Sequence, residues 1–268
     1  MTLFDAGSPA SSPPIDRGRL KLVVAYDGTD FHGFAVQREV RTVGGILTDA
    51  LVAATGQPAD ALHLVCAGRT DAGVHAHGQV VTVDVPEGDD EALRRAVNGM
   101  AAPEVVVRDV ERVPAGFDAR HSARWRRYRY TILNRPEPDP FLARYAWWVP
   151  QALDLTLLRL AADPFVGEHD FAAFCRRAGS ATTVRRVLDS CWHAEGDVLR
   201  YEIRAKAFCW QMVRAIVGTL VDVGTGRRRP GDMLAVLRSG DRAQAPRLAP
   251  AHGLCLWDVG YDALSSPR

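Results

Sequence analysis

The alternation of apolar and polar residues predicts strands and two helices in the first half of the chain. Residues 20–26 alternate with the two-residue period of a strand and end at the turn pair Asp27-Gly28. Residues 43–55 place apolar side chains at helical spacing, with Thr42 as the N-cap and Gly56 as the end. The other elements expected in this half are strands over residues 63–67, 79–85 and 105–110 and a helix over residues 91–100.

The second half repeats the same kinds of element in a similar order. We expect a strand over residues 124–133, helices over 153–162 and 211–223, and a hairpin of strands 184–193 and 198–208 around Gly196-Asp197. This pattern predicts an α+β fold with two similar α/β halves around a mixed, mainly antiparallel sheet. We expect a disordered tail over residues 1–18, rich in Ser, Pro and Ala, and domains over residues 19–115 and 116–268, divided near residues 114–117.

Composition narrows the classes of partner. The chain has 268 residues, 47% of them hydrophobic, so most of it can fold around a core. Its 33 basic and 32 acidic residues leave a net charge of +1, so any surface for nucleic acid must be local. The basic stretch lies between Asp118 and Glu137, where Arg120, Arg124, Arg126, Arg127, Arg129 and Arg135 occur without an acidic residue.

The cysteines and the apolar runs indicate the compartment. The five cysteines stand singly, without a CxxC pair, and no signal peptide precedes them, so we expect reduced thiols. No stretch approaches the roughly 20 apolar residues of a membrane span. We therefore expect a cytoplasmic protein without a membrane partner.

The segment Gly68-Arg69-Thr70-Asp71-Ala72-Gly73-Val74-His75 is the most informative stretch, because it places one carboxylate between two glycines in a loop between strands. As a structural residue, Asp71 would be a turn former, a cap or an ion-pair partner. As a functional residue it would be a nucleophile or a general base.

His75 and His77 are spaced as metal ligands can be, but no HExxH pattern and no cysteine pair accompanies them. We therefore expect structural or substrate-contacting histidines. No glycine-rich nucleotide-binding motif is present either, which favours a reaction without metal or cofactor.

Two further features could serve RNA binding. Strand alternation sends Arg126, Tyr128, Tyr130 and Ile132 to one face and Trp125, Arg127 and Arg129 to the other. The strand is either half-buried structure with solvated arginines or an RNA surface that uses arginines on phosphates and a ring on a base. Arg214 lies in the first turn of its predicted helix, where the helix dipole disfavours a cation, so it is solvated or has an anionic partner such as Asp71 or a phosphate.

Taken together, these motifs resemble the tRNA pseudouridine synthase A family. The stretches that carry the resemblance are Tyr26-Asp27-Gly28, Cys66 through His75, Gly78-Gln79-Val80, Phe117-Asp118-Ala119-Arg120, Arg127-Tyr128-Arg129-Tyr130, Asp170-Phe171, Met212-Val213-Arg214 and Val217-Gly218. Only the octet that ends at His75 is highly specific; the others support it. The chain departs from the family pattern at Gly33-Phe34-Ala35 and Val43-Gly44, which puts the packing of that turn in question.

The resemblance implies the pseudouridine synthase fold with a central RNA-binding cleft, and a homodimer that isomerises uridine to pseudouridine in the anticodon stem-loop (positions 38–40) of tRNA. Asp71 matches the catalytic aspartate of the family, and Arg214 matches the arginine that pairs with it. Tyr128 matches the tyrosine against the target base, Arg69 the arginine that helps hold the nucleotide out of the stack, and Arg120 a basic position near the RNA.

Three other functions stay open at this point. A non-catalytic RNA-binding protein would use the Arg/Tyr strand, with Asp71 only capping a turn. A pseudouridine synthase of the same chemistry could act on another RNA. A metal-dependent hydrolase would use Asp71, His75 and His77, and would lose activity with a chelator.

Overall fold

The computed structural model describes residues 17–176 and 182–262, so the predicted tail over residues 1–18 lies almost wholly outside the described part. The first half contains β1 (Arg17–Tyr26), α1 (Val43–Thr55), β2 (Val65–Cys66), β3 (His75–Pro86), α2 (Asp90–Ala101) and β4 (Val105–Val113). The second contains β5 (Trp125–Leu133), β6 (Trp147–Trp148), α3 (Leu155–Ala162), β7 (Gly167–Asp170), β8 (Val184–Glu195), β9 (Val198–Ala205), α4 (Met212–Gly224), α5 (Asp232–Ser239) and β10 (Leu254–Gly260). No helix of the described residues has the length and apolar character needed to cross a membrane.

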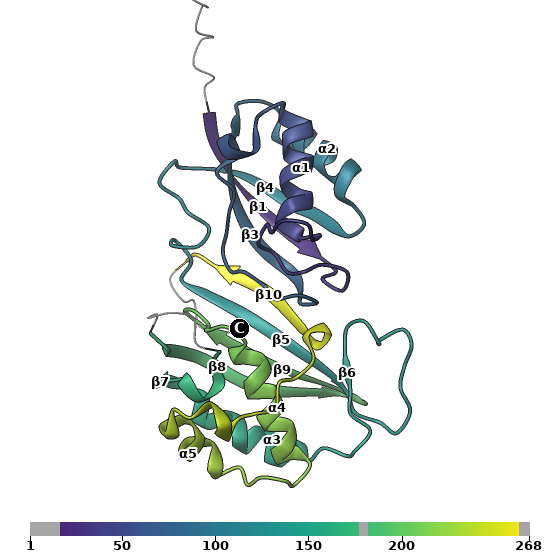
Figure 1. The fold of residues 1–268 in the computed structure, drawn as a ribbon, viewed down its shortest axis with the longest axis vertical. Coiled ribbons are helices and arrows are strands. Elements are labelled where there is room, and N and C mark those ends of the chain that lie inside the picture. The colour runs from purple at the N-terminus through teal and green to yellow at the C-terminus, as the bar shows by residue number, and fades with distance from the viewer. Residues whose placement is uncertain (1–16, 177–181, 263–268) are drawn as a thin grey trace, which may run out of the picture.

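A single ten-stranded sheet runs through both halves in the order β4-β1-β3-β10-β5-β9-β8-β7, with β2 beside β3 and β6 beside β5. The late strand β10 lies between β3, with which it is parallel, and β5, with which it is antiparallel. The α+β class and the mixed, mainly antiparallel sheet are therefore confirmed. The central place of β10, shown in yellow in Figure 1, was not predicted.

Local sequence signals account for the boundaries that were predicted well and for one that was not. Helix α1 has the predicted ends: the Thr42 side chain accepts from the Gly45 N–H, and Gly56 ends the helix in the left-handed region at φ 68°. The strand expected over residues 63–67 is reduced to Val65–Cys66, because a 3₁₀ turn occupies Ala59–Leu62 and His63 has φ 43°.

Register shows which side chains share a face of the sheet. Tyr26 of β1 pairs with Ala76 of β3, and Ala76 pairs with Leu256 of β10. Leu256 pairs in turn with Tyr128 of β5, and Tyr128 with Ile203 of β9. Since directly paired residues point to the same side, one continuous face runs from the first half to the second.

The helices of both halves cover this face. Leu47 and Leu51 of α1 belong to the same buried core as Tyr26. Ser190, the partner of Ile203, donates its hydroxyl to the Ala162 carbonyl at the end of α3. Figure 1 shows α1 and α2 at one end and α3, α4 and α5 at the other, with β10 and β5 between them. A functional site at the centre of the sheet is thus flanked by helices on both sides.

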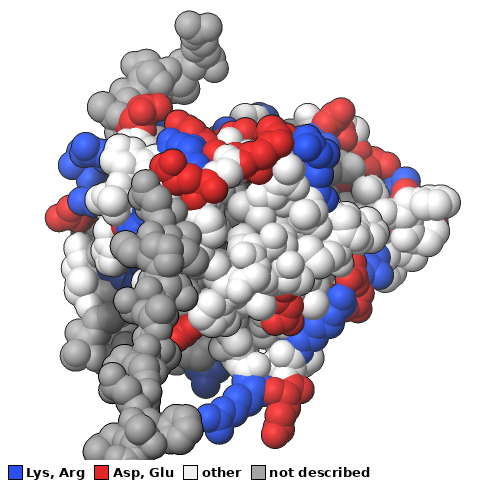
Figure 2. Space-filling model, turned by 90° about the horizontal axis from the view of Figure 1, so that it is seen from above, with Lys and Arg blue, Asp and Glu red and all other residues white. Residues whose placement is uncertain are grey.

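The surface carries both signs of charge. In the view from above, basic and acidic side chains lie next to one another around a broad area without charged residues (Figure 2). This agrees with the net charge of +1.

Candidate active site

The aspartate loop, residues 67–74, connects β2 to β3 and is fixed by buried polar side chains of the sheet. Gln79 donates to the Gly68 carbonyl at 2.6 Å. The Thr70 hydroxyl lies 2.8 Å from the Tyr26 hydroxyl, which also accepts from Gln79 at 3.4 Å. Because these side chains are buried and joined to one another, the loop has a defined conformation next to the core.

The turn after β1 packs closely against this loop. The Phe34 N–H donates to the Thr70 carbonyl at 3.1 Å. A Cβ atom at Gly28 would lie 2.0 Å from the Val74 carbonyl oxygen, and one at Gly33 would lie 2.7 Å from the Thr70 carbonyl oxygen. Both glycines are therefore needed for the close approach of two backbones. The departure at Gly33-Phe34-Ala35 keeps this packing, since the Phe34 side chain is buried.

Asp71 of the first half and Arg214 of the second lie close together, so Asp71 is the anionic partner that the position of Arg214 in its helix suggested. Arg214 Nη1 lies 3.7 Å from Asp71 Oδ2, and Arg214 Nε donates to the Ala249 carbonyl at 2.8 Å, which fixes the guanidinium. Burial raises the pKa of Asp71, while the Arg214 charge and a hydrogen bond from the Trp210 side chain act in the opposite direction. The carboxylate is thus partly desolvated and faces the Arg214 guanidinium.

Tyr128 lies on the same face of the sheet as Tyr26, close to the aspartate loop. Its ring is buried and packs edge-on against Phe208 with the ring centroids 4.9 Å apart. Burial and the nearby Asp71 charge raise the pKa of the phenol, so it is neutral near pH 7. Within the described part of the chain the hydroxyl has no hydrogen-bond partner, which leaves it available to a ligand.

Arg69 and Arg120 are exposed at the edge of the site. Arg69 belongs to the aspartate loop, and Arg120 lies just before β5. Arg127 and Arg129 point to the opposite face of β5. There Arg127 pairs with Asp258 at 2.5 Å and Arg129 with Glu202 at 2.6 Å, so their charges are already compensated.

The two histidines have structural partners. His75 Nδ1 accepts from the Gly28 N–H at 3.0 Å, so its proton is on Nε2, which donates to the His252 carbonyl at 3.1 Å. His77 stacks on Trp257 with the centroids 4.3 Å apart. Among residues 17–176 and 182–262 no three His, Cys, Asp or Glu side chains form a group that could hold a metal ion. Asp71, His75 and His77 therefore do not form the ligand set that the hydrolase alternative needs.

Two contacting residues had no role in the sequence analysis. The Trp210 side chain lowers the pKa of Asp71, and Phe208 packs on Tyr128. Both lie in the connection from β9 to α4 that also leads to Arg214. Their position in that connection was the available signal, but the partner of each is more than 70 residues away in the sequence.

The matching family model places this α+β sheet, with an aspartate, an arginine and a tyrosine near its central strands, in the class of pseudouridine synthases. The model of the tRNA pseudouridine synthase family matches residues 22–122 and 161–262. The chain therefore belongs to the tRNA pseudouridine synthase family, which consists of isomerases that convert uridine to pseudouridine.

Relatives agree with this assignment. The tRNA pseudouridine synthase A of Frankia casuarinae is 48% identical over 251 residues, which cover 91% of this chain and 89% of the relative. The protein of the same name from Leifsonia xyli is 42% identical over 266 residues and covers 91% of both chains. That of Pseudothermotoga lettingae is 39% identical, covering 91% of this chain and 99% of the relative.

Proposed function

We propose that this enzyme isomerises uridine to pseudouridine in the anticodon stem-loop of tRNA (positions 38–40), with Asp71 as the nucleophile. The observation that carries the proposal is the Asp71–Arg214 pair, which joins a carboxylate of one half to a guanidinium of the other beside a buried tyrosine.

The chemistry needs an ionised carboxylate. The N1–C1′ bond of uridine breaks, the free uracil turns in the pocket, and C5 bonds to the same C1′. C5 then loses its proton and N1 gains one, so the product is an isomer of the substrate. Asp71 could attack C1′, add to C6 or remove the C2′ proton, and each of these routes uses its charged form. Arg214 supports all three by holding that charge and its orientation.

The other residues suit the handling of an extruded nucleotide. Turning a base out of a stem costs about a few kcal/mol of stacking and pairing. Packing of the extruded base against Tyr128 and insertion of Arg69 into the space that the base leaves in the stem would offset part of this cost in free energy. Arg120 would contact a phosphate near the cleft. We also propose, from the family resemblance, that the enzyme acts as a homodimer in the cytoplasm, where the five free cysteines would stay reduced.

The test compares wild type with Asp71→Asn on an unmodified tRNA transcript, with Asp109→Asn, an exposed residue of β4, as the matched control. Pseudouridine is mapped by carbodiimide adducts and primer extension. We expect stops in the anticodon stem-loop with wild type and the control, and a loss of at least about a thousandfold in rate for Asp71→Asn. The affinity for tRNA should stay within about threefold, since it comes largely from phosphate contacts.

Two results would contradict the proposal. Substantial turnover by Asp71→Asn would exclude Asp71 as the nucleophile. Stops by wild type only outside the anticodon stem-loop, or only in another RNA, would exclude the proposed substrate while leaving the isomerase chemistry in place.

A further inference from the structure

Arg126 is a buried arginine of β5 whose guanidinium binds only backbone carbonyl groups. Nε and Nη2 both donate to the Ala67 carbonyl, at 3.2 and 2.8 Å. Nη2 also donates to the Arg120 carbonyl at 2.6 Å, and Nη1 to the carbonyls of Lys206 and Ala123 at 2.8 and 3.4 Å. An arginine has five N–H donors, and these contacts use all of them.

This arrangement is unusual for a buried cation. Arg126 is only 8% exposed, and across residues 17–176 and 182–262 no ion pair joins it to a carboxylate. Burial accordingly lowers its pKa. A buried charge without a counter-charge is unfavourable unless its hydrogen bonds are complete. A neutral apolar residue would fill the same space without the free-energy cost of desolvating a charge. The arrangement therefore calls for a role beyond packing.

The carbonyls come from three segments, each of which leads to a residue of the site. Ala67 opens the aspartate loop, so it fixes the position from which Asp71 projects. The Arg120 carbonyl belongs to the segment that presents the exposed Arg120 side chain. Lys206 begins the connection from β9 to α4, which leads to Phe208, Trp210 and Arg214. Strand alternation puts Tyr128 beside Arg126 on the same face.

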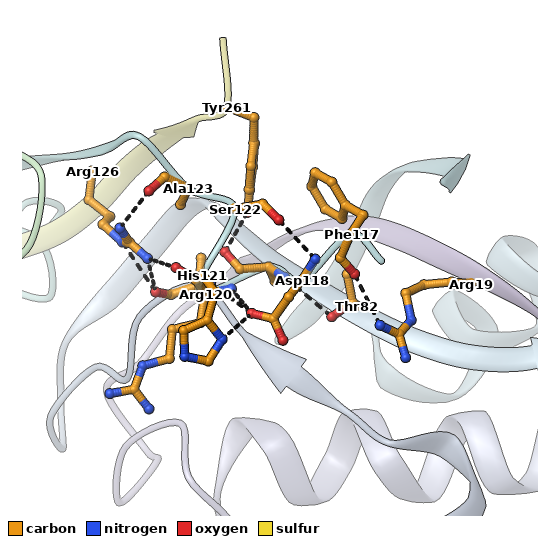
Figure 3. Close-up of polar contacts among 12 residues, drawn as sticks. Arg19, Thr82, Phe117, Asp118, Arg120, His121, Ser122, Ala123, Arg126 and Tyr261 are labelled. Atoms are coloured by element: carbon orange, nitrogen blue, oxygen red, sulfur yellow. Dashed lines mark hydrogen bonds and ion pairs between the residues drawn. The ribbon is translucent and has the colours of Figure 1, made fainter. Parts of the chain in front are cut away.

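The segment that holds Arg120 is itself anchored on its other side, as Figure 3 shows. Arg19 of β1 donates to the Phe117 carbonyl at 3.1 Å. Thr82 of β3 accepts from the Ala119 N–H at 3.4 Å, and Tyr261 donates to the Ala119 carbonyl at 2.8 Å. This segment is thus attached to both halves independently of Arg126, so loss of Arg126 leaves it anchored while freeing its tie to the aspartate loop.

We propose that Arg126 is a positioning residue for the isomerisation: it fixes the aspartate loop relative to Tyr128 and to the connection that carries Arg214. The inference rests on the proposed role of Asp71. Arg126 does not bind the RNA itself, because its donors are already occupied by the protein. It acts through the 3.7 Å separation of Asp71 and Arg214.

The test uses Arg126→Lys and Arg126→Gln, with Arg127→Lys as the control from the opposite face of the same strand. Lysine keeps the charge but offers three donors at one point, so it cannot bridge three segments. We expect the single-turnover rate at saturating tRNA to fall by about 10- to 100-fold in both variants, because a misplacement of about 1 Å has effects of this size. The affinity for tRNA and its salt dependence should match those of wild type.

A pH profile separates positioning from mere stability. Displacement of the loop changes both the burial of Asp71, which raises its pKa, and its distance from Arg214, whose charge lowers it, so the acid limb of the rate should move away from its wild-type position. Rates equal to wild type per folded molecule, with only the melting temperature lowered, would overturn the inference. So would a weaker affinity with a salt slope smaller by about one, which indicates a direct phosphate contact.

The same series distinguishes the two proposals. If wild type gives no pseudouridine in the stem-loop, or Asp71→Asn remains active, the proposed function fails. If wild type is active, Asp71→Asn is inactive and the Arg126 variants react as fast as wild type, only the positioning role fails. Should Arg126→Gln not fold, the rate and pH profile of Arg126→Lys alone decide.

Discussion

The carboxylate of Asp71 experiences opposing influences on its charge. Partial burial disfavours the ionised form and makes it more reactive when it exists, while Arg214 and Trp210 favour it. The net direction of the pKa is upward, so burial is the larger influence. The rate should accordingly fall on acidification at a higher pH than an ordinary aspartate would give.

Trp210→Phe tests this balance at a single residue. The substitution keeps an aromatic ring but removes the hydrogen bond that lowers the pKa of Asp71, so that pKa rises further and the acid limb of the single-turnover rate moves to higher pH. At alkaline pH, where Asp71 is ionised in both proteins, the rates should converge to within about threefold.

Trp148→Phe, in an exposed tryptophan distant in sequence from the site, provides the control and should keep the wild-type profile. An acid limb that stays in place or moves to lower pH in Trp210→Phe would show that the indole does not stabilise the Asp71 charge.

At the scale of single residues, the sequence singled out the proposed reacting group but not the residues that hold it in place. Asp71 stands in a specific octet, and Arg214 was set apart by its unfavourable place at a helix start. Gln79, Trp210 and Arg126 gain their significance from contacts with residues far away in the chain, and local pattern contains no information about such contacts.

The connection from β1 to α1 and the aspartate loop behave as one element, because two backbones meet without side chains between them. A Cβ at Gly28 would approach the Val74 carbonyl oxygen to 2.0 Å, and a backbone atom cannot move aside as a flexible side chain can. The loop must shift instead, and Asp71 shifts with it.

Gly28→Ala should therefore lower both activity and stability. We expect a rate loss of about 100-fold from displacement of Asp71. The free energy of unfolding, measured with urea, should fall by about 1–3 kcal/mol, as is typical of overpacking. Gly88→Ala, where no atom lies within 4 Å of the added Cβ, should change neither, and an active Gly28→Ala would show that the loop tolerates the displacement.

Elements were predicted well where their signals are local. Helix α1 has a capping threonine, an apolar stripe and a terminal glycine within its own sequence. The strands β6, of two residues, and β7, of four, are too short for a periodic pattern. Strand β10 begins with the apolar residues Leu254 to Trp257, but its place between β3 and β5 depends on pairings across the whole chain.

At the scale of the whole molecule, β10 makes one folding unit of the two halves. Leu256 is fully buried and pairs with Ala76 on one side and Tyr128 on the other. The proposed division near residues 114–117 therefore separates two structural halves that share a sheet, and we expect them to unfold together.

Tryptophan fluorescence and circular dichroism can test this cooperativity. All six tryptophans lie in the second half, and Trp257, which stacks on His77, and Trp210, beside Asp71, also contact the first half, so their fluorescence follows mainly the second half, whereas the far-ultraviolet signal follows both. We expect coincident urea transitions by the two probes. Leu256→Ala should lower the free energy of unfolding by about 2–5 kcal/mol and keep the transitions coincident. Two separate transitions in wild type would show that the halves are independent.

The position of β10 also has a consequence for synthesis of the protein. The aspartate loop is translated early and the arginine helix later, but the strand that joins their two half-sheets follows both of them. A growing chain therefore holds two incomplete sheets with exposed edges until residue 260 has emerged from the ribosome, and only then can Asp71 meet Arg214. Catalytic competence would arise at the end of translation, in one step and for both halves at once.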